Sequence, residues 1–150
     1  MGKTCSFFGH RKIINGVEIA EEVKAFVEKL IVEEEFTTFL FGEFGEFDEV
    51  CFECVSKLKE KYSMISRVCC VADEKELRKG KSQRYLQCYD EIIYLPLSYD
   101  YWYKRIYYRN CEIIEKSDFI IFYAEERVNS GAYKALRYAQ RKKKKYMNFF

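Results

Sequence analysis

The sequence has only one histidine and one proline among its 150 residues, and it has no long apolar segment. No apolar run reaches the roughly 20 residues that a membrane-spanning helix needs. The opening residues lack the charged stretch followed by an apolar one that marks a secretory signal peptide. The net charge is only +2, so the overall charge indicates neither nucleic acid nor membranes as partners. We therefore expect a soluble, cytoplasmic protein.

The seven cysteines lack the pattern of a disulfide framework, because their number is odd and they are scattered through predicted strands and helices. Cys51 and Cys54 have the spacing of redox and zinc sites. They lie on the apolar face of a predicted helix, however, and the chain offers no second CxxC motif and no histidine besides His10. We expect Cys51 and Cys54, like Cys69 and Cys70, to be core thiols, and we expect no metal and no cofactor.

The chain does contain a regular alternation of strand-like and helix-like segments. Strands are predicted at 4–8, 37–41, 64–71, 91–95 and 118–123, with a final one at 146–149. Helices are predicted from Asn15-Gly16 to Ile31, at 47–62, at 106–114 and at 131–143. The first helix has apolar residues at helical spacing, namely Val17, Ala20, Val23, Val27, Leu30 and Ile31. Residues 73–90 are predicted to form a loop or flap, and residues 98–103 a tyrosine-rich connection.

This alternation predicts right-handed crossovers and a mainly parallel sheet that carries helices on both faces. A chain of this length is expected to form one domain. In such folds, ligands bind outside the carboxyl ends of the strands. Two predicted strands run into small residues and a helix, one at Gly9 and the other towards Ser130-Gly131. Bare peptide N–H groups at a helix start bind anions, so we expect a phosphate-bearing ligand at this edge.

Several motifs together resemble one protein family. The opening Cys-Ser-Phe-Phe-Gly-His-Arg at 5–11 resembles the YpsA-like branch of the SLOG superfamily, which includes DprA, the LOG-type phosphoribohydrolases and nucleotide-sensing modules of bacterial defence systems. Three further segments are similar to family motifs in the same order and spacing, namely Gly42-x-x-Gly45-x-Phe47-Asp48, Arg109-Asn110 with Ser117-Asp118, and Ser130-Gly131-Ala132-Tyr133. The similarity extends over nearly the whole chain.

The resemblance implies a Rossmann-like three-layer α/β fold with a mainly parallel sheet, formed by a single domain over 1–150. It also implies binding of a nucleotide or nucleotide-derived small molecule, as a sensor or sequestering module, at the carboxyl edge of the sheet. The ligand contacts that it implies are Gly9, His10, Arg11, Gly42, Gly45, Asp48, Arg109, Asn110, Ser130 and Gly131. The catalytic glutamate of the phosphoribohydrolases has no counterpart in 129–135, and Glu43 replaces a usual glycine, so no catalytic residue is assigned.

Most of these residues also have a structural interpretation. His10 could donate to a phosphate or could hold its loop in place. Arg11 could pair with a phosphate or with a surface carboxylate, and Arg109 with a phosphate or with strand ends. Asp48 could bind a ribose hydroxyl or complement the helix dipole. Gly42 and Gly45, in the turn after the predicted strand at 37–41, could be needed for tight turning alone. Ser130 can cap a helix and bind an anion at the same time.

Two other functions and one assembly remain open at this stage. An N-glycosidic hydrolase or transferase would need a carboxylate near the sugar, for which Glu43, Glu46 and Asp48 are available. The basic run 141–145 could bind single-stranded nucleic acid, but a solvated helix end explains it equally, so nucleic acid is the less favoured partner. The tyrosines at 99, 101, 103, 107 and 108 could stack on a base or form a protein contact, and a homodimer is expected.

Overall fold

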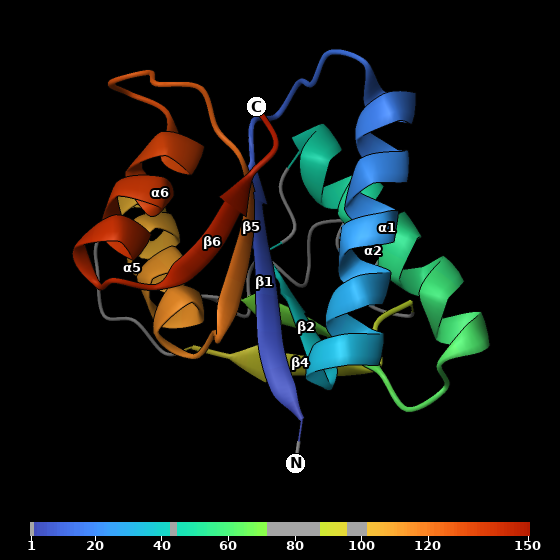
Figure 1. Ribbon diagram of the computed structural model, residues 1–150. Coiled ribbons are helices and arrows are strands. Elements are labelled where there is room, and N and C mark those ends of the chain that lie inside the picture. Colours follow the sequence, from blue (N-terminus) through green and yellow to red (C-terminus); the bar gives the residue numbers. More distant parts are fainter. Residues whose placement is uncertain (1, 43–44, 72–87, 96–101) are drawn as a thin grey trace.

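The computed structural model describes residues 2–42, 45–71, 88–95 and 102–150. It has three layers, with a sheet between two pairs of helices (Figure 1). Helices α1 (Gly16–Glu34) and α2 (Gly45–Lys61) cover one face, and α5 (Trp102–Glu115) and α6 (Gly131–Arg141) cover the other. The predicted Rossmann-like three-layer α/β fold is confirmed.

The sheet has six strands in the order β4-β3-β2-β1-β5-β6, and every described strand pair is parallel. The strands are β1 (Lys3–Gly9), β2 (Phe36–Phe41), β3 (Ser66–Val71), β4 (Glu91–Tyr94), β5 (Phe119–Tyr123) and β6 (Lys145–Asn148). The chain builds outward from β1 to β4 and then returns to add β5 on the other side of β1. The order therefore reverses between β1 and β5, which is where open parallel sheets form their crevice.

The central strands are buried on both faces, which explains why they read as continuous apolar runs. Neighbouring side chains alternate between the two faces. Phe7 of β1 packs with α1 and α2 and stacks on Phe41 with ring centroids 5.0 Å apart, whereas Phe8 packs with α5 and α6 and stacks on Phe122 at 5.8 Å. Each face thus has its own aromatic core, and β1 and β5 hold the two cores together.

Some predicted details were wrong. Helix α1 begins at Gly16 as predicted, with Asn15 in the left-handed region at φ 60°, but its first apolar residue, Val17, is 77% exposed, and Ile19 is buried instead. Helix α5 begins at Trp102 rather than near residue 106, and β3 begins at Ser66 rather than at 64. Residues 73–87 of the predicted flap and 98–101 of the predicted connection lie outside the described residues.

The cysteine prediction is confirmed for the CxxC pair. Cys51 and Cys54 are buried on the face of α2 that packs against the sheet, and the Cys54 thiol donates to the carbonyl of Ala20 at 3.3 Å. Burial raises the pKa of the Cys51 thiol well above its usual value and that of Cys54 to about 11. Within the described segments, no helix is long and apolar enough to cross a membrane.

Candidate functional site

A cleft of about 1480 Å³ opens at the carboxyl edge of the sheet, beside the ends of β1 and β5. Its described walls are the end of β1 with the residues after it, the turn after β2, one face of α5, and the segment from the loop after β5 into α6. In Figure 1 these parts meet at the top of the molecule and on the α5 and α6 side. Typical small-molecule sites measure about 300–1,000 Å³, so this cleft has room for an elongated ligand.

Nine of the ten predicted ligand contacts line this one cleft. They are Gly9, His10, Arg11, Gly42, Asp48, Arg109, Asn110, Ser130 and Gly131. These residues come from four separate parts of the chain, which the sheet brings together at one edge. Their contact with a ligand remains a prediction, but the shared crevice that it requires is present.

Gly45 is the predicted contact that does not line the cleft. Its φ is +91°, and a Cβ there would lie 2.6 Å from the Cα of Arg11. The glycine lets the start of α2 approach the segment after β1, where the Glu46 amide donates to the Arg11 carbonyl at 2.9 Å and the Glu46 carboxylate accepts from the Ile13 amide at 2.8 Å. Gly45 therefore has a structural role. The Glu46 amide at the start of α2 already donates within the protein.

Gly9 and Gly42 lie at points where other side chains pass close to the backbone. A Cβ on Gly9 would lie 2.3 Å from the ring of Phe47, so α2 can pack at this distance only because residue 9 is glycine. A Cβ on Gly42 would lie 3.0 Å from a terminal nitrogen of Arg109. The Arg109 guanidinium thus lies over the end of β2, and it is buried in the cleft wall with only 2% of the residue exposed. It brings a positive charge to the carboxyl edge, as the phosphate interpretation of Arg109 requires.

His10 is held on both sides of its ring. Its Nε2 accepts a hydrogen bond from the peptide N–H of Glu125 at 2.7 Å, and its Nδ1 lies 3.3 Å from the hydroxyl of Ser130. Because a peptide N–H can only donate, we assign the ring proton to Nδ1, which then donates to Ser130. Burial and the charge of Arg127 lower the pKa of His10, with Glu125 opposing them. His10 is therefore a neutral residue that orients Ser130, and it does not supply a positive charge to a phosphate.

Ser130 caps α6 and faces the cleft. Its hydroxyl oxygen accepts from the Tyr133 amide at 3.2 Å and from the Nδ1–H of His10. With both lone pairs engaged, the hydroxyl proton is left to donate to another oxygen. The amides of Gly131 and Ala132, in the first turn of α6, have no carbonyl one turn earlier within the helix to bond. A Cβ on Gly131 would meet nothing within 4 Å, so the glycine borders open space. This helix start is suited to bind an anion.

The other predicted helix start does not reach the cleft. The cleft residues after β1 end at Lys12, whereas α1 begins at Gly16. The His10 amide, the first after the end of β1, donates to the carbonyl of Tyr123 at 3.2 Å and is not bare. The expectation of two anion-binding helix starts is wrong in this respect, because six residues separate β1 from α1 and carry the chain away from the edge.

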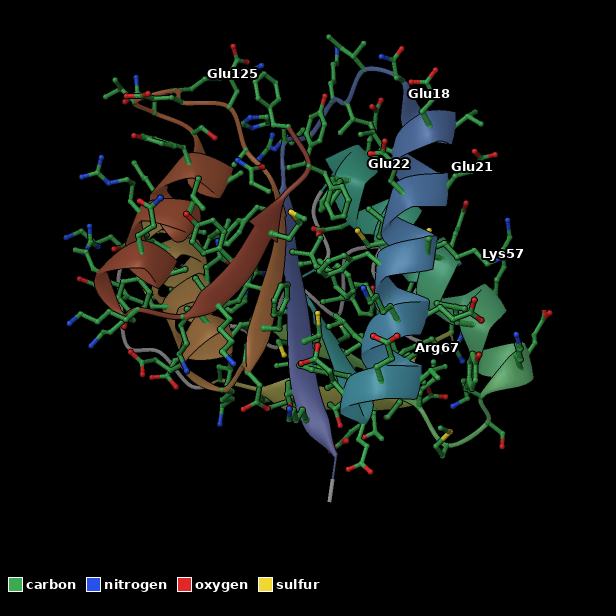
Figure 2. The ribbon with its side chains drawn as sticks, viewed as in Figure 1. Glu18, Glu21, Glu22, Lys57, Arg67 and Glu125 are labelled. Carbon is green, nitrogen blue, oxygen red and sulfur yellow. The ribbon has the colours of Figure 1, made fainter. Side chains whose placement is uncertain are left out.

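The loop between β5 and α6 is fixed by a segment that the sequence reasoning did not connect with the site. The Asn148 side chain, at the end of β6, accepts from the Ala124 amide at 3.0 Å and donates to the Ala124 carbonyl at 2.9 Å. The ring of Phe150 packs edge-on against His10 and Tyr123. Glu125, whose amide donates to His10, follows Ala124 in the chain and lies at the upper end of the molecule in Figure 2. The available signal was the side-chain amide of Asn148 within the predicted final strand at 146–149.

The described lining of the cleft is strongly basic. It contains eight arginines and lysines but two carboxylates, although the whole chain is nearly neutral. The cations are Arg11, Lys12, Lys104, Arg109, Arg127, Lys134, Arg137 and Arg141, and the carboxylates are Asp48 and Glu126. Tyr107, Tyr108 and Tyr133 also line it, whereas the tyrosines at 99 and 101 lie outside the described residues. Clustered charge of one sign in a cleft concentrates ligands of the other sign.

The candidate carboxylates for glycosidic chemistry are not equivalent. Asp48 lines the cleft from the first turn of α2. Glu46 does not line it, and its carboxylate accepts from the amide of Ile13. Glu43 lies outside the described residues. Of the three acids, the structure therefore places Asp48 where it could meet a ligand, and it adds Glu126 from the loop before α6.

The basic run 141–145 is divided by the fold. Lys142 pairs with Glu115 at 3.4 Å, and Lys144 donates to the carbonyls of Glu115 and Ser117, near the end of α5, at 3.2 and 3.1 Å. Arg141 instead lines the cleft and donates to the Tyr107 hydroxyl at 3.3 Å. Two of the lysines thus bind the end of α5, and not only solvent at the end of their own helix as the structural interpretation had it, and Arg141 lines the cleft.

Comparison with known proteins supports the fold. No family model and no curated protein matches the sequence. Among solved structures, the chain is similar to DNA processing protein A (DprA) from Streptococcus pneumoniae, with a TM-score of 0.70 and 14% identity over 97% of this chain and 49% of that one. It is also similar to TM1055, a structural genomics target, with a TM-score of 0.60 and 11% identity over 96% of this chain and 72% of that one. The chain spans about half the length of DprA, and it shares its fold with these two structures.

Proposed function

We propose that the protein binds a nucleotide or nucleotide-derived small molecule in the cleft at the carboxyl edge of the sheet and leaves it chemically intact, as a sensor or sequestering module. The observation that carries this proposal is the start of α6. There, the Ser130 hydroxyl proton and the first amides of the helix border open space beside Gly131. A phosphate group fits such a set of donors.

The surroundings of this helix start support a ligand with a phosphate and a ring. Arg109, buried over Gly42, contributes a fixed positive charge, and the lining contains more cations than carboxylates. Tyr107 and Tyr108 offer faces on which a base could stack. Asp48 provides an acceptor for a ribose hydroxyl. The fold shared with DprA and TM1055 is consistent with this assignment.

Three further parts of the proposal concern the protein as a whole. We place the chain in the YpsA-like branch of the SLOG superfamily, as a single domain over 1–150. We expect it to be cytoplasmic and to form a homodimer, which light scattering would test. Asp48 keeps an N-glycosidic hydrolase or transferase as the second candidate, because it is the one predicted acid that lines the cleft in the described part of the chain.

The test uses two glycines that both begin a helix. Gly131 begins α6 at the cleft, whereas Gly16 begins α1 away from it, and a Cβ at Gly16 would make only an ordinary contact of 3.7 Å with Ile13. In calorimetric titrations with a panel of nucleotides, we expect at least one nucleotide to bind the parent protein. Gly131→Leu should weaken that binding by about tenfold or more through steric overlap, and Gly16→Leu should not change it.

Two results would count against the proposal. Equal binding by the parent, Gly131→Leu and Gly16→Leu proteins would show that the ligand lies elsewhere, and absence of binding by every nucleotide would remove the ligand class. Chromatography of the recovered nucleotide identifies the second candidate. Free base in the parent reaction that disappears with Asp48→Asn would establish hydrolysis instead of simple binding.

A further inference from the structure

The cleft continues beyond the start of α6 into the groove between α6 and α5, which lie side by side on one face of the sheet (Figure 1). Tyr133, Arg137 and Arg141 lie four residues apart along α6 and all line the cleft. This spacing puts them on one helix face. The rise of an α-helix places Arg137 about 9 Å and Arg141 about 15 Å along the axis from Gly131. One phosphate bound at Gly131 would therefore lie too far from Arg141 for both arginines to contact it.

Arg137 and Arg141 are exposed, and no carboxylate forms an ion pair with either of them in the described segments. Arg137 donates to the hydroxyl of Tyr133 at 3.2 Å, and Arg141 donates to that of Tyr107 at 3.3 Å. A guanidinium has five N–H groups, so each arginine is held by a neutral oxygen and keeps donors for a further acceptor. By contrast, Lys142, the next residue after Arg141, pairs with Glu115. Glu126, which also lines the cleft, attracts Arg137 electrostatically but forms no ion pair with it within the described segments. The fold thus pairs the lysine outside the cleft with a carboxylate and leaves both arginines inside it without such a pair.

We propose that Arg137 and Arg141 form a second anion subsite, so that the ligand carries two phosphate groups separated by a nucleoside, as in a dinucleotide. This inference rests on the proposed function, because it takes the start of α6 as the first phosphate site. Tyr107 also lines the cleft and could stack on the intervening nucleoside, whereas the Tyr133 ring already has the Arg137 guanidinium over it at 6.0 Å. The cleft volume of about 1480 Å³, above the usual range for small-molecule sites, provides the room that such a ligand needs.

The test compares ligands that differ by one nucleotide. AMP and pApA, and likewise GMP and pGpG, are titrated calorimetrically into the parent protein and into Arg137→Gln/Arg141→Gln. Lys142→Gln/Lys143→Gln is the matched control, because it removes two positive charges from the same end of the chain without changing a cleft residue. In at least one base series, we expect the dinucleotide to bind the parent about tenfold more tightly than the mononucleotide. The arginine variant should lose this difference while keeping its mononucleotide affinity, and the lysine variant should keep both.

Four results would overturn the inference. The first is equal affinity for mononucleotide and dinucleotide in the parent, which leaves the proposed function standing. The second is a loss of affinity in the arginine variant that is equal for mononucleotide and dinucleotide. The third is a loss of dinucleotide affinity in the lysine control as large as that in the arginine variant, which would indicate an effect of overall positive charge. The fourth is affinity that keeps rising with single-stranded oligonucleotides beyond two nucleotides, which would make nucleic acid the occupant. Absence of binding by all four small probes would instead count against the proposed function, and the inference would fall with it.

Discussion

The two helical layers of the protein differ in charge and in what their arginines contact. Helices α1 and α2 carry eleven acidic residues and five lysines, whereas α5 and α6 carry two glutamates and six lysines and arginines. Figure 2 shows Glu18 and Glu21 on the outer side of α1, far from α6. Arg67, which faces the acidic layer, is bound by Asp90 and Ser56, whereas Arg137 contacts the hydroxyl of Tyr133. The arginine beside the acidic layer is thus paired with a carboxylate, whereas the basic layer contributes arginines to the lining of the cleft.

The largest effect on stability is expected at the centre of the acidic layer. Phe47 is fully buried, packs on Gly9 and stacks on Tyr123 with centroids 5.7 Å apart. Phe47→Ala should lower the free energy of unfolding by about 3–5 kcal/mol because it leaves a cavity under the end of β1. Denaturant unfolding measures this change. A loss below about 1 kcal/mol would show that α2 does not support the cleft in the way described.

A matched pair of arginine substitutions compares the two layers directly. Arg67→Gln removes two hydrogen bonds to Asp90 and one to Ser56, so it should cost about 1.5–3 kcal/mol of stability and leave nucleotide affinity unchanged. Arg137→Gln should change stability by less than about 0.5 kcal/mol, because the side chain is exposed. Denaturant unfolding of both variants checks the difference. Equal destabilisation would contradict the division of roles between the layers.

A smaller effect is expected from the titration of His10. Burial and Arg127 lower the pKa of His10 in the folded protein, so the unfolded chain binds its proton more readily. The contribution of His10 to stability is therefore complete above the ordinary histidine pKa of about 6.5 and is lost as the pH falls below it. The unfolding temperature should drop between about pH 7.5 and pH 5.5. His10→Ala should have a lower unfolding temperature throughout and a weaker pH dependence in this range. An unchanged pH dependence would contradict the neutral state assigned to His10.

Much of the fold could be predicted from the sequence because its signals are local. The predicted strand 118–123, for example, is a continuous apolar run after Asp118, and burial on both faces of a parallel sheet requires such runs. The inward face of α1 was less certain, since Val17 fits the helical spacing as well as Ile19 does and only the packing of the first turn distinguishes them. The early start of α5 was missed for a similar reason, because Trp102 and Tyr103 suit a helix or an aromatic connection equally well.

The location of the cleft could be predicted from the sequence, but the hydrogen bonding of its lining residues could not. Strand ends at one edge of a parallel sheet must meet, so residues as distant as Gly9 and Gly131 could be grouped in advance. The protonation state of His10 could not be predicted, because it depends on a hydrogen bond from the amide of Glu125, which lies 115 residues away in the chain. The role of Gly45 depends on its approach to Arg11. The division of the basic run also required the positions of Glu115 and Tyr107 relative to α6.

The most direct test of the account is to map the amide signals of the isotope-labelled protein during titration with AMP and pApA. We expect the largest shifts at Gly131 and Ala132 for both ligands, with added shifts along α6 towards Arg141 for the dinucleotide alone. Signals of α1, on the opposite face of the sheet, should not move. Shifts centred on α1 or α2, or no shifts at the start of α6, would contradict the claim that this helix start is the phosphate site.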